Sequence, residues 1–138
     1  MPYWRLLYHL VWTTFDRQPS LRGQCEELLH QILRGKASEL GVVVYALGNA
    51  EDHVHLVVSI PPKLAVSECV RHLKGASSHA LNHAGSLAVF RWQEGYGVLS
   101  LTDQVLRTAI DYVLGQKQHH RSNTTRATYE QSSDPTGS

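Results

Sequence analysis

The segment "GVVVYALGNAEDHVHLVVSI", residues 41–60, contains two runs rich in β-branched residues that are separated by the polar tetrapeptide "NAED". This pattern is typical of two antiparallel strands joined as a hairpin. Side chains alternate between the two faces of a strand, so the second run divides into two rows. One face receives the apolar row Val54, Leu56, Val58 and Ile60, and the other receives His53, His55, Val57 and Ser59. We therefore expect helices to cover the apolar row and the two histidines to lie on the opposite, open face.

The flanking sequence continues this alternation of strands and amphipathic helices. Residues 3–14 alternate strictly, as in a strand with one strongly apolar face, and residues 22–40 and 66–83 carry apolar side chains near helical spacing. The predicted elements, in the order βαββαββα, are a strand at 3–14, a helix at 22–40, strands at 41–48 and 53–60, a helix at 66–83, short strands at 88–93 and 96–101, and a helix from 103 to about 120. This order predicts an α+β fold of the ferredoxin-like (RRM-like) kind, with helices on one face of an antiparallel sheet.

Length and composition indicate one small globular domain at residues 1–121, followed by a polar tail at 122–138 that we expect to be disordered. No apolar run approaches the roughly 18 residues that cross a bilayer, and the N-terminus does not resemble a signal peptide. We therefore expect a cytoplasmic protein with no membrane partner. The net charge is only +1 with histidine neutral, so any binding of nucleic acid must depend on local patches.

The two histidines of the second run could form half of a metal site. Their Cα atoms would lie roughly 6 to 7 Å apart on one strand face, close enough to bind one divalent cation if a third ligand comes from elsewhere. The pair is also compatible with a cupin, with a zinc hydrolase or with no metal.

The last predicted helix offers two partners for this pair. Tyr112 and Gln116 are four residues apart, so they lie one turn apart on the same helical face, at the edge of its apolar stripe. Taken singly, Tyr112 is more often an aromatic residue at the rim of the core, and Gln116 a helical residue that faces solvent. Their combination with His53 and His55 favours a catalytic centre.

Five segments, in this order, resemble the single-domain tyrosine transposases of the IS200/IS605 type, which are members of the HUH group of single-strand DNA nucleases. They are "YWRLLYHLVWTT", "HVHLVVSIPP", "HLKGASSHALN", "FRWQEGYGVLSL" and "YVLGQKQHH". The resemblance covers about residues 2–121. It implies cleavage and rejoining of single-stranded DNA at hairpin-bearing element ends through a 5′-phosphotyrosine intermediate.

The same resemblance assigns roles to individual residues. It makes Tyr112 the nucleophile, His53 and His55 ligands of Mg²⁺ or Mn²⁺, and Gln116 the third protein ligand. It also implies a homodimer in which the tyrosine-bearing helix can complete the active site of the other subunit. An edge strand such as residues 2–14 could pair across the two-fold axis.

Further residues are weaker candidates for DNA contacts. Basic side chains suit phosphate, and an aromatic ring suits unpaired bases. The predicted contacts are Arg5, Arg71, Lys74, Arg91, Trp92, His119 and His120. His9 shares the open face of the first strand with Arg5. It could form a hydrogen bond to one of the metal ligands, or it could simply be hydrogen-bonded to a neighbour; the two alternatives are about equally common.

The sequence is compatible with two other functions. A domesticated relative could hold hairpin DNA or RNA on its sheet without cutting it. Alternatively, the protein could be a small metal-dependent hydrolase that uses His53 and His55, with no catalytic role for Tyr112.

Overall fold

The computed structural model of the chain describes residues 3–84 and 89–115 and confirms an α+β fold built on an antiparallel sheet. In chain order the elements are β1 (Leu7–Thr13), the short 3-10 helix η1 (Phe15–Arg17), α1 (Gln24–Glu39), β2 (Val43–Asn49), β3 (His53–Ser59), α2 (Val66–Asn82), β4 (Gly97–Leu101) and α3 (Asp103–Leu114). None of the described helices is long and apolar enough to cross a bilayer. The predicted tail at 122–138 and the predicted helical residues 116–120 lie outside the described residues.

The sheet has the strand order β2-β3-β1-β4. β1 pairs with β3 on one side and with β4 on the other, so the prediction that the first strand lies at an edge is wrong. The described edges are β2 and β4. This register places Val11 opposite His55 and Thr13 opposite His53, and it places Gly48 of β2 beside His55 on the other side.

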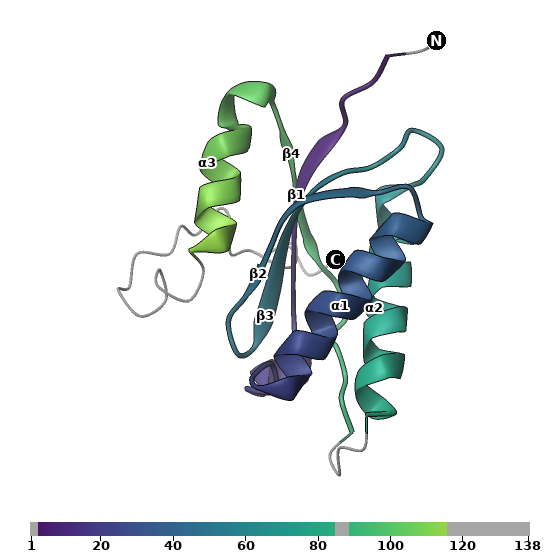
Figure 1. The fold of residues 1–138 in the computed structure, drawn as a ribbon, viewed down its shortest axis with the longest axis vertical. Helices are drawn as coiled ribbons and strands as arrows, with labels where there is room; N and C mark the ends of the chain where they lie inside the picture. The colour runs from purple at the N-terminus through teal and green to yellow at the C-terminus, as the bar shows by residue number, and fades with distance from the viewer. Residues whose placement is uncertain (1–2, 85–88, 116–138) are drawn as a thin grey trace.

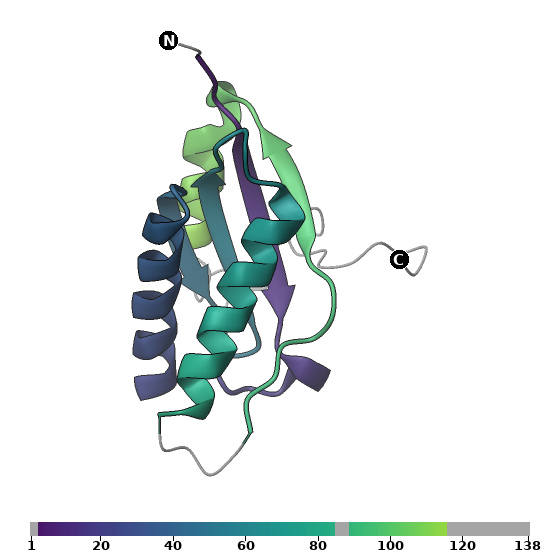
Figure 2. The same ribbon diagram turned by 90° about the vertical axis from the view of Figure 1, so that its right-hand side faces the viewer.

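α1 and α2 lie side by side on one face of the sheet (Figures 1 and 2). They cover the apolar row predicted for β3, together with alternate side chains of β1 such as Leu10 and Trp12. Leu10, Trp12 and Leu56 have no exposed surface. The period-two pattern therefore correctly identified the side chains that form this main core.

α3 packs on the opposite face, where the histidines lie, so the prediction that all helices share one face is wrong (Figure 1). Its Ala109 and Val113 bury a second, smaller apolar cluster against Ala46 of β2 and Val57 of β3. These two sheet residues lie on the same face as the histidines, which also carries apolar side chains such as Val11 and Leu101. Burial of their surface favours the docking of a third helix over an open sheet.

The strand predicted at 88–93 is also wrong: among residues 89–93, only Trp92 pairs, in an isolated bridge with Thr14. The backbone of Phe90 is satisfied by a side chain, whereas Arg91 and Gln93 form single backbone hydrogen bonds with Phe15 and Thr13. Asn82 of α2 accepts a hydrogen bond from the Phe90 N–H at 2.7 Å and donates to the Phe90 carbonyl at 3.0 Å. The segment is thereby fixed along α2 and continues into β4.

Candidate active site

Three predicted site residues meet between the sheet and α3. The ring centroids of His53 and His55 are 5.0 Å apart, and the Tyr112 ring meets His55 edge to face at 6.0 Å. Their side chains are almost completely buried, and Tyr112, which the sequence placed at the edge of the apolar stripe, is only 4% exposed. The last turn of α3 thus brings the predicted nucleophile to the predicted metal ligands within one chain.

His9 of β1 also belongs to this cluster. Its Nε2 atom lies 2.8 Å from Nδ1 of His55, and the two rings stack with a centroid separation of 5.0 Å. Both residues are buried, so the contact is shielded from solvent. This geometry fits both predicted alternatives, a residue next to a metal ligand and a histidine hydrogen-bonded to a neighbour, so a role of His9 toward a metal stays a prediction.

Asp52 supports the other histidine. Its Oδ1 lies 2.6 Å from Nδ1 of His53, and its second oxygen accepts a weaker hydrogen bond from Arg17 at 3.4 Å. Burial of the Asp52 carboxyl opposes ionisation, but the hydrogen bond from His53 and the nearby charges outweigh it and lower the pKa of Asp52 below its ordinary value. Asp52 is therefore ionised at neutral pH and can accept a hydrogen bond from the Nδ1–H of His53. Sequence reasoning missed this residue, although its place directly before the two histidines was a usable signal.

The two histidines need a further ligand to hold a metal ion. Among residues 3–84 and 89–115, no three His, Cys, Asp or Glu side chains are placed to bind one together. Two buried imidazoles whose Nδ1 atoms are already oriented by neighbours are nevertheless a suitable pair of ligands. Gln116, the predicted third ligand, lies outside the described residues, as do His119 and His120.

Arg5, a predicted DNA contact, connects the segment before β1 to α3. Its Nε donates a hydrogen bond at 2.8 Å to Oδ1 of Asp103, the first residue of α3. This hydrogen bond and the charge of Asp103 raise the pKa of Arg5. The pair is largely exposed and lies at the end of α3 opposite to Tyr112.

The other predicted DNA contacts within the described residues make contacts inside the protein. Arg71 pairs with Glu68 one turn earlier in α2. Lys74 donates to the Gln93 and Gly95 carbonyls at 2.7 and 3.1 Å, and its burial lowers its pKa.

Trp92 and Arg91 likewise bind other parts of the chain. The Trp92 indole N–H donates to Ser77 at 2.9 Å and its ring packs on Trp12 of the main core, while the Arg91 guanidinium lies 4.1 Å from the Phe15 ring centroid. Trp92 and the α2 residues thus belong to the α1–α2 side of the sheet. DNA contacts by any of them stay predictions.

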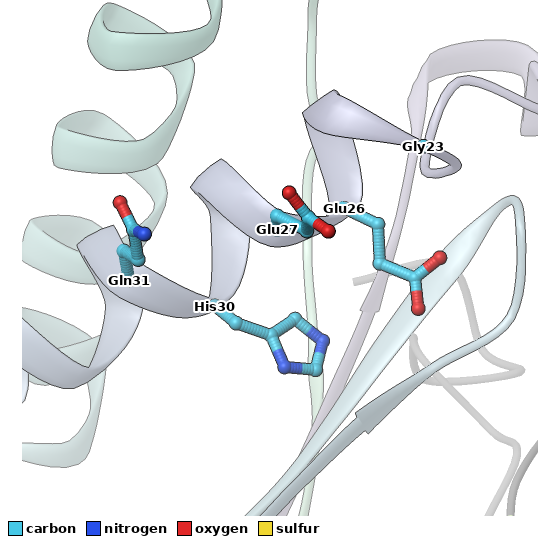
Figure 3. A pocket seen from close by; sticks show the side chains of 5 residues that line it. All are labelled: Gly23, Glu26, Glu27, His30 and Gln31. Atoms are coloured by element: carbon cyan, nitrogen blue, oxygen red, sulfur yellow. The ribbon is translucent and has the colours of Figure 1, made fainter.

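A separate hollow on the first turns of α1 is not part of this site (Figure 3). It is lined by Gly23, Glu26, Glu27, His30 and Gln31. His30 Nε2 lies 2.7 Å from Oδ1 of Asn49, which pairs with Val54 and therefore faces α1. The hollow and the His53–His55 pair are on opposite faces of the sheet.

The chain is similar to known proteins in both sequence and fold. The family described as "Transposase IS200 like" matches residues 2–116. The ISDra2 transposase TnpA of Deinococcus radiodurans is 30% identical over 128 residues, which cover 86% of this chain and 87% of the relative. A crystal structure described as that of a transposase from Deinococcus radiodurans R1 matches with a TM-score of 0.68 and 27% identity, covering 91% of this chain and 95% of that one. A REP-associated tyrosine transposase bound to a REP hairpin shares the fold, with a TM-score of 0.68 at 16% identity over 87% of this chain and 72% of that one.

Proposed function

Because the chain belongs to the family of IS200-like transposases, we propose that it cleaves and rejoins single-stranded DNA at hairpin-bearing element ends through a 5′-phosphotyrosine on Tyr112. The observation that supports this chemistry best is the contact of the Tyr112 ring with His55, beside His53. The tyrosine and the histidines come from different elements, α3 and β3. A solely structural tyrosine would not require two polar imidazoles beneath it.

In the proposed reaction the phenol oxygen of Tyr112 attacks the phosphorus of the scissile phosphodiester. A bond forms between phosphorus and the tyrosine oxygen while the bond to the 3′ oxygen breaks; the phenol loses its proton, and the 3′ oxygen leaves as a hydroxyl. A phenol, whose ordinary pKa is about 10, is a good leaving group, so a 3′-hydroxyl can later displace Tyr112 and rejoin the DNA. One phosphodiester is exchanged for another, so the reaction needs no ATP.

We assign His53 and His55 as ligands of Mg²⁺ or Mn²⁺, with Gln116 as the third protein ligand. Nδ1 of His53 is hydrogen-bonded to Asp52, and Nδ1 of His55 is hydrogen-bonded to His9. Both rings would therefore bind the cation through Nε2. This requires His55 to donate its Nδ1 proton to His9. When bound, a divalent cation polarises a non-bridging oxygen of the scissile phosphate and stabilises the charge of the transition state. Neutral imidazole and amide ligands leave the positive charge of the site undiminished.

Replacement of Asp52 by asparagine should weaken Mn²⁺ binding by roughly 10-fold or more, within the range found when a partner of a metal-bound histidine is removed. The amide keeps the size of the carboxylate but loses the charge that fixes the Nδ1 proton on His53. Isothermal titration with Mn²⁺ measures the change, and Glu68→Gln on the far side of the sheet is a matched control. Equal affinity in Asp52→Asn and wild type would show that Asp52 does not support the ligand.

The proposed function is tested by incubating the protein with Mg²⁺ and labelled, hairpin-bearing single strands. We expect a protein–DNA adduct that survives denaturation and requires the metal. Binding without an adduct would instead support a hairpin-binding module. Metal-dependent hydrolysis that persists in Tyr112→Phe would support a simple hydrolase.

We further propose that the protein acts as a homodimer on hairpin-bearing single strands. Exposed apolar side chains lie on both described sheet edges: Val43 and Tyr45 on β2, and Val98 on β4. Unpaired edges with apolar side chains favour association with another chain. Size-exclusion chromatography with light scattering should give twice the mass of one chain at micromolar concentration, whereas the mass of a single chain throughout would contradict the dimer.

A further inference from the structure

Gly48 lies where α3 comes closest to the sheet. It pairs with His55, so the two residues share the face that α3 covers. A methyl group placed on Gly48 would lie only 2.1 Å from the backbone oxygen of Val113 and 3.1 Å from its carbonyl carbon. Such an oxygen contact is far inside van der Waals distance, and the obstructing atom is backbone and cannot rotate away. Only glycine allows α3 to lie at this depth.

This contact determines how the last turn of α3 is seated. Val113 follows Tyr112 directly, so the depth of its carbonyl against β2 also sets the position of the tyrosine ring over His55. The surrounding apolar cluster is small, with Ala46, Val57 and Ala109 as its other buried members. The Arg5–Asp103 pair at the opposite end of α3 is exposed, and exposed ion pairs contribute little to docking.

We propose that Gly48 is a positioning residue of the transposase: its missing side chain forms the notch in which the last turn of α3 seats, and this sets the distance between Tyr112 and His55. The inference rests on the proposed role of Tyr112 as nucleophile. An alanine would require the 2.1 Å separation to grow to at least 3.0 Å, a displacement of about 0.9 Å. Misplacement of a reacting group by about 1 Å can reduce a rate by about 100-fold.

The test compares Gly48→Ala with wild type and with Gly35→Ala. Gly35 lies on α1, and a methyl group there meets no atom within 4 Å, so this control makes the same substitution without a clash. Two quantities are measured: the nuclear Overhauser effect between the rings of Tyr112 and His55, and the single-turnover rate of adduct formation at saturating hairpin DNA. Methyl signals of Leu56 and Leu73 report on the main core.

In Gly48→Ala we expect the ring-to-ring signal to disappear and the adduct rate to fall about 100-fold, with hairpin affinity and core signals unchanged. Gly35→Ala should match wild type in every measurement. An unchanged signal and rate in Gly48→Ala would overturn the proposal. Loss of the core signals would overturn it as well, because Gly48 would then be needed for the fold. If wild type forms no adduct, the tyrosine chemistry fails, but a signal lost only in Gly48→Ala still supports the positioning.

Discussion

Tyr112→Phe should abolish the covalent protein–DNA adduct and reduce strand cleavage by at least roughly 10³-fold, as expected when a covalent nucleophile is removed. Phenylalanine keeps the ring that packs on His55 and removes only the oxygen that would bond to phosphorus. Because the ring that fills this buried position is retained, we expect the packing of α3 to be preserved. The variant should therefore bind hairpin DNA and Mn²⁺ with affinities close to those of wild type.

The measurement is denaturing electrophoresis of labelled hairpin DNA after incubation with Mg²⁺. Tyr96→Phe is the matched control, because Tyr96 is half-buried against the main core on the other side of the sheet. It should form the adduct at the wild-type rate. Persistence of the adduct in Tyr112→Phe would show that another residue is the nucleophile.

Replacement of both His53 and His55 by alanine should remove specific Mn²⁺ binding and with it all metal-dependent cleavage. The two imidazoles are the proposed ligands from β3, and without them Gln116 alone cannot hold the cation. Both side chains are buried, so the variant also loses packing, and circular dichroism must confirm that it is folded at the assay temperature.

Isothermal titration and the electron paramagnetic resonance of Mn²⁺ measure this loss. His30→Ala is the matched control, because His30 bonds to Asn49 on the opposite face and should leave Mn²⁺ binding unchanged. If the folded double variant binds Mn²⁺ as tightly as wild type, the metal site lies elsewhere. The assignment of His53 and His55 would then be wrong.

Most of the fold could be predicted because burial follows the period of each element. Alternation in residues 53–60 correctly divided β3 between the main core and the histidine face. The position of α3 could not be predicted in this way, because its seat consists of small residues scattered over β2 and β3. Residues 88–93 have a strand-like composition, but Asn82 satisfies the backbone of Phe90, which no local pattern reveals.

The candidate site was predictable where a residue type limits the chemistry. His53, His55 and Tyr112 were named from spacing and family resemblance, and the structure brings them together. Asp52 and Gly48 were missed, since their importance depends on contacts between elements: one to a ring nitrogen, the other to the backbone of α3. Trp92 was named for its residue type alone, and its contact with Trp12 depends on the fold; a contact with DNA stays a prediction.

Mapping the covalent bond by mass spectrometry would decide whether Tyr112 is the nucleophile. Trypsin cleavage after Arg107 and Lys117 releases the peptide "TAIDYVLGQK", residues 108–117, in which Tyr112 is the only tyrosine. After reaction with hairpin DNA and nuclease digestion, we predict that this peptide carries a 5′-phosphonucleotide on Tyr112. A nucleotide on any other residue, or an unmodified peptide from a reaction that has cut its DNA, would contradict the tyrosine mechanism.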